Sequence, residues 1–88
     1  MNKYVVQLSR EAEHTLDLMH KREPILFKRV VQAIDQLERD PHQGKLLKGV
    51  LKGRYSYRVG SYRIIYTIQR SKLIVQIIDI GHRRDIYR

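Results

Sequence analysis

The segment YSYRVGSYRIIY, residues 55–66, decides the fold. Tyrosine, valine, arginine and isoleucine alternate on either side of Gly60 and Ser61, a pattern typical of two strands joined by a tight hairpin turn. A two-residue turn places Arg58 opposite Arg63 on the neighbouring strand. Since side chains alternate along a strand, both arginines belong to one face of the predicted sheet.

The residues around this hairpin predict two helices and two further strands. Residues 3–8 form a short β-branched run that ends at Ser9, which can cap a helix. Pro24 suits the first turn of a second helix, and the step Asp40-Pro41 ends it because a residue before proline avoids helical dihedral angles. Period-two alternation then predicts strands at residues 55–59, 62–68 and 73–80.

Each predicted helix has one apolar and one charged face, so both helices must cover an apolar surface. We therefore expect a single small α+β domain over residues 1–88, with an antiparallel four-stranded sheet and the two N-terminal helices packed on one face, in the order β-α-α-β-β-β. The other face of the sheet stays free of helices. By the same alternation, Tyr57, Tyr62 and Tyr66 point toward the helices and belong to the core.

The charge of the chain is unevenly distributed. Eighteen Lys and Arg against nine Asp and Glu give a formal net charge of +9. Residues 1–40 hold seven bases and seven acids, whereas residues 41–88 hold eleven bases and two acids. A surplus confined to one half attracts a polyanion, with nucleic acid first and an acidic protein or anionic membrane next. A basic surface that merely solubilises the protein is the alternative.

Some classes are excluded by composition. The chain has no cysteine, which excludes disulfides and thiolate chemistry. A run of about 18 consecutive apolar residues, the length that would suggest a membrane helix, does not occur. Neither secretion nor membrane insertion is indicated, and we expect a cytoplasmic protein.

Cations from three segments are predicted to converge on the free sheet face. A two-residue turn at residues 70–71 would set Arg63 opposite Ile78 and carry the same face on to Ile80 and His82. More basic residues and one tyrosine flank these strands on both sides. They are Lys48, Lys52, Arg54, Arg83, Arg84 and Tyr87.

This pattern favours a phosphodiester ligand. Like charges directly opposite on a sheet are unfavourable by about 0.2–1 kcal/mol, so folding alone does not select two facing arginines, although both could splay into solvent. A guanidinium group binds two phosphate oxygens through parallel hydrogen bonds and stabilises developing negative charge. His14, His20 and His42 lack the i,i+4 spacing of a helical metal pair, and we predict neither a metal nor a cofactor.

The order of strand, two helices, an LKG loop, YSYRVGSYRIIY and a terminal GHRRDIYR resembles the RelE branch of the RelE/ParE toxin superfamily over essentially the whole chain. The resemblance implies a toxin that enters the ribosomal A site and cuts mRNA by metal-free attack of a ribose 2′-oxygen on the adjacent phosphate. It also implies a cognate antitoxin that binds and silences the toxin, with operator DNA contacted only through that complex.

The resemblance also implies roles for individual residues. Arg63 and Arg83 would hold the scissile phosphate, and Arg58, alone or with Lys52, would stabilise charge or help to protonate the leaving 5′-oxygen. Ser56 departs from the family pattern, because many relatives carry Lys or Arg at that position. The residues expected to bind RNA are Lys48, Lys52, Arg54 and Arg84.

The general base stays open between Tyr87 and His82. The family pattern favours Tyr87, but the reference pKa of a phenol, about 10, must fall by roughly three units before the group is ionised near neutral pH. An imidazole, with a reference pKa of about 6.5, is usable without such help.

Two other functions stay open. A ParE-like protein of the same fold poisons DNA gyrase without ribonuclease chemistry, and the tyrosine among bases in HRRDIY speaks against it. A nucleic-acid-binding module would use the same arginines to contact phosphates without cutting, and its affinity would fall steeply with salt.

Overall fold

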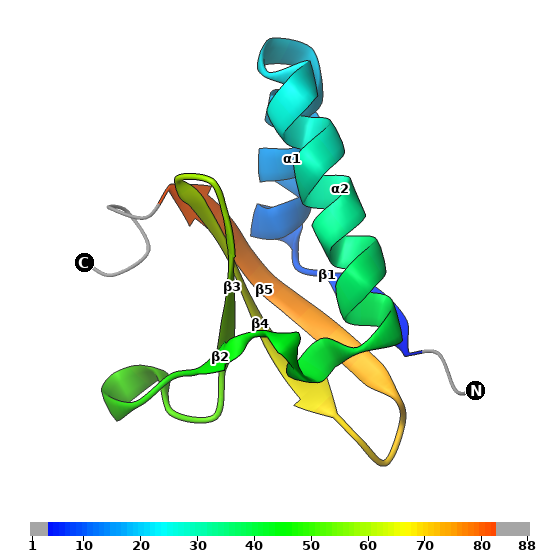
Figure 1. Ribbon diagram of the computed structural model, residues 1–88, viewed down its shortest axis with the longest axis vertical. Coiled ribbons are helices and arrows are strands. Elements are labelled where there is room, and N and C mark those ends of the chain that lie inside the picture. Colours follow the sequence, from blue (N-terminus) through cyan, green and yellow to red (C-terminus); the bar gives the residue numbers. More distant parts are fainter. Residues whose placement is uncertain (1–3, 83–88) are drawn as a thin grey trace.

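The computed structural model describes residues 4–82, which form one sheet with two helices on one side (Figure 1). The elements are β1 (Val5–Leu8), α1 (Arg10–Arg22), α2 (Pro24–Arg39), the 3-10 turn η1 (Pro41–Gln43), β2 (Lys45–Leu46), the 3-10 turn η2 (Gly49–Leu51), β3 (Tyr55–Val59), β4 (Tyr62–Gln69) and β5 (Ile74–His82). The strand order is β1-β5-β4-β3-β2, with β1 parallel to β5 and every other pair antiparallel.

The predicted α+β class, with two helices on one sheet face, is confirmed. The sheet differs from the expected one in two respects: it has five strands, and β1 joins it in parallel. The extra strand, Lys45–Leu46, lies in a segment expected to be a loop, and two residues are too few to show alternation. The first strand forms one edge of the sheet beside β5, and β2 lies at the opposite edge.

Ser9 starts α1 and also ties it to the sheet. Its hydroxyl oxygen accepts a hydrogen bond from the backbone N–H of Ala12 at 3.1 Å, which satisfies a donor that a helix start leaves open. The same hydroxyl donates to the carbonyl oxygen of Ile78, and the Ser9 N–H donates to that of Ile77 at 2.9 Å. Ile78 lies at a β-bulge, where the pairing of β4 with β5 shifts by one residue, so the helix cap occupies a carbonyl at the irregular point of the sheet.

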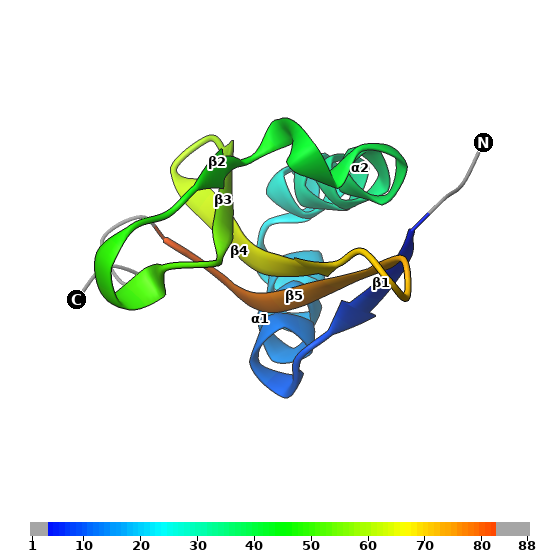
Figure 2. The same cartoon turned by 90° about the horizontal axis from the view of Figure 1, so that it is seen from below.

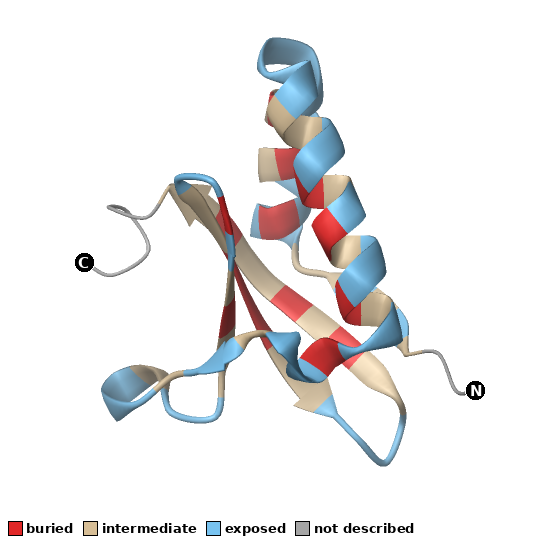
Figure 3. Ribbon diagram, viewed as in Figure 1, coloured by how far each residue is buried: buried red, intermediate tan, exposed pale blue. Residues whose placement is uncertain are grey.

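The core lies between the sheet and the helices (Figure 3). Tyr66 is fully buried there, and Tyr57 and Tyr62 are partly buried against the same cluster, as predicted from their alternation. Burying one large apolar side chain contributes about 1.5–3 kcal/mol to folding. The buried cluster consists of Ala12, Leu16, Met19, Val30, Ala33, Leu37, Val59, Ile64, Tyr66, Val75, Ile77 and Ile80.

The hydroxyl of Tyr66 holds the connection between α2 and β2 in place. It donates a hydrogen bond to the carbonyl oxygen of Pro41 at 2.6 Å and accepts one from the N–H of Gly44 at 3.0 Å. The ring of Tyr66 stacks on that of Tyr55, with centroids 5.4 Å apart. Burial raises the pKa of Tyr66 to about 12. The protonated phenol is therefore the form that the fold requires.

We expect the protein to lose stability as the pH rises from about 10 to about 12. The unfolded chain releases the phenolic proton near pH 10, whereas the folded protein keeps the proton of Tyr66 until about pH 12. The free energy of unfolding should therefore fall across this window by roughly 2 kcal/mol. Denaturant titrations at stepped pH measure the slope. Tyr66→Phe should flatten it, and equal slopes in both proteins would exclude Tyr66 as its source.

Gly44 is required by the close approach of Tyr66. Its φ of −75° is open to any residue, but a Cβ atom at this position would lie 2.2 Å from the Tyr66 hydroxyl oxygen and 3.0 Å from the carbonyl oxygen of Ser56. Gly44→Ala should lower the free energy of unfolding by about 1–3 kcal/mol, measured by denaturant titration. Combined with Tyr66→Phe it should lower stability by less than the sum of the two changes, because phenylalanine removes the clashing oxygen. Additive effects would contradict this contact.

Candidate functional site

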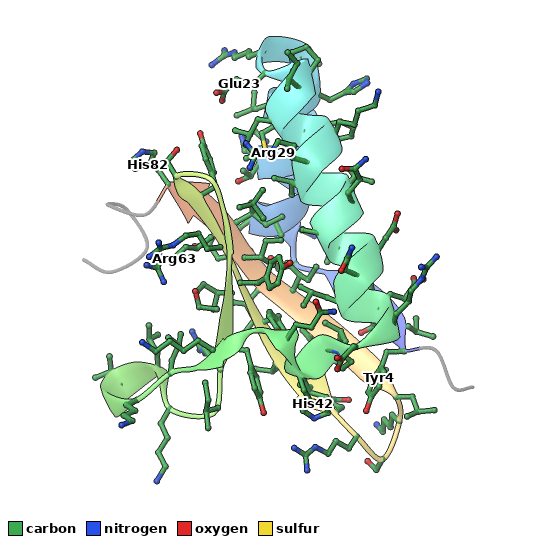
Figure 4. All side chains as sticks on the ribbon, in the orientation of Figure 1. Tyr4, Glu23, Arg29, His42, Arg63 and His82 are labelled. Atoms are coloured by element: carbon green, nitrogen blue, oxygen red, sulfur yellow. The ribbon has the colours of Figure 1, made fainter. Side chains whose placement is uncertain are left out.

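Arg58 and Arg63 face each other across the β3–β4 hairpin, in the predicted register. Arg63 extends from the side of the sheet opposite the helices (Figure 4). Arg58 is exposed, whereas Arg63 is half-buried and donates a hydrogen bond from Nη1 to the Ser56 Oγ at 3.3 Å. Ser56 is only 4% exposed. At the position where family members were expected to carry a cation, this chain has a buried hydroxyl that contacts the neighbouring arginine.

The next row of paired residues on this face contains Lys45, Ser56, Ile65 and Asp79, one from each of four neighbouring strands. Ile65 is 2% exposed, so this face of the sheet also contains a buried apolar side chain. Asp79 brings a carboxylate to a face that was predicted to be cationic only. It was missed because its position depends on the bulge in the pairing of β4 with β5, which the alternation does not reveal.

The predicted register between β4 and β5 is wrong. Arg63 pairs with Gly81, not with Ile78. Two features displace the strand: the connecting turn has four residues, 70–73, instead of two, and the bulge adds one more. In the turn, Leu73 adopts a φ of 54°. This conformation is uncommon for a leucine and could not be predicted from the sequence.

A shift of three residues is odd, so it reverses the faces of the final residues of β5. Ile80 pairs with Ile64 and His82 with Tyr62, both on the helix side, which contradicts their predicted place beside Arg63. The rings of Tyr62 and His82 meet edge to face with centroids 5.7 Å apart. The imidazole and the guanidinium of Arg63 therefore start from opposite faces of the sheet.

The loop between β2 and β3 carries the other predicted cations that the structure describes. Lys48 and Lys52 are exposed and Arg54 is half-buried, and the loop projects on the side of the sheet away from the helices (Figures 1 and 2). The N–H of Leu47 donates to the carbonyl oxygen of Arg54 at 2.8 Å, which closes the base of the loop. The remaining candidates, Arg83, Arg84 and Tyr87, lie outside the described residues.

The histidines do not assemble a metal site in residues 4–82, where no three His, Cys, Asp or Glu side chains come close enough to hold an ion. His20 packs its ring against that of Phe27, with centroids 4.8 Å apart, and His42 lies 3.9 Å from a carboxylate oxygen of Asp40. Neither helix in the described part of the chain combines the length and the apolar character that crossing a membrane requires.

Known proteins resemble this chain along almost its full length. The family described as ParE toxin of type II toxin-antitoxin system, parDE, matches residues 6–87. Toxin RelG of Mycobacterium tuberculosis is 38% identical over 87 residues, which are 97% of each chain. A chain in the crystal structure of the toxin-antitoxin complex RelBE2 from the same organism is 34% identical, with a TM-score of 0.79 over 93% of this chain and 100% of that one. A YoeB/ParE toxin from Agrobacterium tumefaciens, 17% identical over 89% of this chain and 96% of its own, has a TM-score of 0.80 and shares the fold.

Proposed function

The chain belongs to the RelE/ParE superfamily of type II toxin-antitoxin toxins, and from this premise we propose that it is a cytoplasmic, ribosome-dependent endoribonuclease that cuts mRNA in the A site. A cognate antitoxin silences it, as the solved RelBE2 complex of a relative suggests. Residues 1–88 act as a single toxin domain. The observation that carries the proposal is the pair Arg58 and Arg63 on the sheet face free of helices, with Arg63 held by Ser56.

The proposed reaction uses only groups of the RNA and of the protein. The ribose 2′-oxygen loses its proton to a general base and attacks the adjacent phosphorus, the bond to the 5′-oxygen breaks, and that oxygen takes up a proton. The products are a 2′,3′-cyclic phosphate and a 5′-hydroxyl end. Negative charge grows on the phosphoryl oxygens in the transition state, and the guanidinium of Arg63 stabilises it there by paired hydrogen bonds. Arg83 assists at the same phosphate.

Arg58 is suited to the leaving oxygen. It faces Arg63 across the hairpin and is more exposed, so it reaches a second oxygen of the same phosphodiester. Lys52 on the neighbouring loop supports it, and Lys48, Arg54 and Arg84 bind flanking RNA. We assign the general base to Tyr87 ahead of His82, because the imidazole of His82 starts on the helix side of the sheet against Tyr62. A pH profile of cutting by Tyr87→Phe and His82→Gln decides between them.

A second candidate is inhibition of DNA gyrase, because the family description that matches residues 6–87 names ParE. This function would need no transition-state stabilisation by Arg63. Primer extension on mRNA from translating ribosomes, with and without purified protein, separates the two. Discrete cuts in the A-site codon support the ribonuclease, whereas intact mRNA together with inhibited DNA supercoiling supports gyrase as the target.

Ser56 should contribute to cutting through Arg63. Ser56→Ala removes the oxygen that accepts the hydrogen bond from Arg63 Nη1 and leaves the backbone pairing intact. We expect the rate of cutting by ribosome-bound toxin to fall about tenfold to a hundredfold, since a hydrogen bond to a charged group such as this guanidinium contributes about 1.5–3 kcal/mol. Ser56→Thr, which keeps the hydroxyl, should retain most of the rate. Equal loss in both variants would point to packing in this buried position instead.

A further inference from the structure

The C-terminal half of β3 has an open edge. In residues 4–82, β2 pairs only with Tyr55 and Ser56, so the rest of β3 has no neighbouring strand on that side. Helix α2 flanks this edge, and a cleft of about 240 Å³ lies between the two. Its walls are formed by Arg29, Gln32, Ala33 and Gln36 of α2 and by Tyr57, Arg58, Val59 and Gly60 of the hairpin.

Two arginines from different elements line the cleft. Figure 4 shows Arg29 in the space between α2 and the tip of the hairpin, and its Nη1 lies 3.6 Å from the position of a Cβ atom built on Gly60. Gly60 has a φ of 61°, which turns the chain beside this guanidinium. In the part of the chain that the structure describes, neither Arg29 nor Arg58 forms an ion pair or a side-chain hydrogen bond.

The remaining polar groups are neutral. Gln32 and Gln36 each add a carboxamide, which offers both donors and an acceptor, and Tyr57 contributes a hydroxyl-bearing ring. Among residues 4–82, no carboxylate lines the cleft. Glu23 shares a neighbouring hollow with Arg29, but its Oε2 accepts a hydrogen bond from the Tyr62 hydroxyl at 3.4 Å. The cleft is therefore cationic, and amide groups line it together with its two arginines.

We propose that this cleft is a second nucleic-acid subsite that takes one nucleotide of RNA outside the cut site. The phosphate is bound between Arg29 and Arg58, and the base edge meets Gln32 and Gln36. Arg58 belongs both to this cleft and to the arginine pair, so RNA can run from the sheet face around the open edge of β3 to α2. The inference rests on the nucleic-acid binding in the proposed function, but not on cutting.

An extended peptide that pairs with the open edge of β3 is the competing occupant. Such peptides gain affinity mainly from a row of main-chain hydrogen bonds. Here the edge is open only over Tyr57–Val59, which provides few of them. Guanidinium and carboxamide groups line the cleft instead, and these are the groups that bind phosphates and form hydrogen bonds with base edges. The lining therefore favours RNA.

Anisotropy titrations with a fluorescein-labelled oligouridylate, at several salt concentrations, test the subsite. Arg29→Gln should weaken binding about threefold to tenfold and reduce the slope of log affinity against log salt by about 0.7, the value for one phosphate contact on a single strand. Arg39→Gln is the matched control, because Arg39 is also exposed on α2 and lies outside the cleft. It should change affinity less than twofold. Both variants should unfold at the wild-type temperature.

Amide shifts provide a local readout. Addition of 5′-AMP to ¹⁵N-labelled protein should shift the amide resonances of Val59 and Gly60, and Arg29→Gln should abolish these shifts. Equal affinities of the Arg29 and Arg39 variants, or wild-type protein that binds no oligouridylate, would overturn the subsite. Arg29→Gln that retains RNA binding but loses an acidic peptide would assign the cleft to a peptide.

These outcomes are separable from the ribonuclease proposal. Binding that depends on Arg29, in a protein that leaves mRNA intact on ribosomes, would reject the enzyme and keep the subsite. Cutting of mRNA by a protein whose RNA affinity is independent of Arg29 would reject the subsite and keep the enzyme.

Discussion

Replacing Arg63 by alanine is expected to lower mRNA cutting by about two to three orders of magnitude, the usual loss when one donor to a transition-state oxyanion is removed. Arg63 is half-buried on the free face of the sheet, and its contact with Ser56 fixes the guanidinium before RNA arrives. Primer extension on mRNA from translating ribosomes measures the loss. Cells that express the variant should also resume growth.

Two further variants make this result specific. Arg70→Ala removes the same charge from the exposed turn between β4 and β5 and should leave cutting within about twofold of wild type, because a single exposed charge has little influence at a distance. Arg63→Lys keeps the charge but loses the planar guanidinium, so its rate of cutting should lie between those of Arg63→Ala and Arg70→Ala. Arg83→Ala should resemble Arg63→Ala. Toxicity retained in both alanine variants, with normal unfolding temperatures, would remove this site from the mechanism.

Ile64→Asp is expected to abolish folding. Ile64 is 0% exposed in β4, where it lies between Tyr57 of β3 and Ile80 of β5 and faces the helices. An ionised carboxylate there would have no partner, and the penalty of several kcal/mol is comparable with the whole stability of a small domain, about 5–15 kcal/mol. Circular dichroism should show loss of the native spectrum, and size-exclusion chromatography should show an expanded or aggregated chain.

The position of the isoleucine sets the size of the effect. Ile34→Asp should destabilise the protein less, because Ile34 is only half-buried on α2. Ile25→Asp, at a side chain that is 79% exposed, should change the free energy of unfolding by no more than about 0.5 kcal/mol. A cooperative unfolding transition at the wild-type temperature for Ile64→Asp would contradict the assigned core.

The elements could be predicted where a local rule governs them. Ser9 marks the start of α1 by its capping side chain, and Pro24 and the Asp40-Pro41 step mark the two ends of α2 by the backbone restrictions of proline. The Gly60-Ser61 turn likewise determines the pairing of Arg58 with Arg63. The pairing of β4 with β5 could not be predicted in this way. It depends on a turn with Leu73 in a left-handed conformation and on a bulge that the Ser9 hydroxyl contacts from another part of the chain.

The same division holds for the site. The pairing of Arg58 with Arg63 depends on one turn and was predicted correctly. The faces of Asp79 and His82 depend on the bulge, so Asp79 was missed and His82 was assigned to the wrong face of the sheet. The cleft beside Arg29 was not predicted either, because it forms only when α2 packs next to a strand edge that β2 leaves open. Such contacts between distant segments are not encoded in the periodicity of any single element.

The parallel pairing of β1 with β5 has a consequence for synthesis of the protein. Ser9 and Ile78, joined by the helix cap, are 69 residues apart in sequence, so β1 leaves the ribosome long before its partner exists. Contacts of such separation slow folding, because a long loop must close before they stabilise anything. Until β5 emerges, Arg63 lacks the strand beside it and α1 lacks a strand against which it packs. The nascent toxin therefore acquires its working surface only after β5 has been made, which gives an antitoxin an interval in which to be present first.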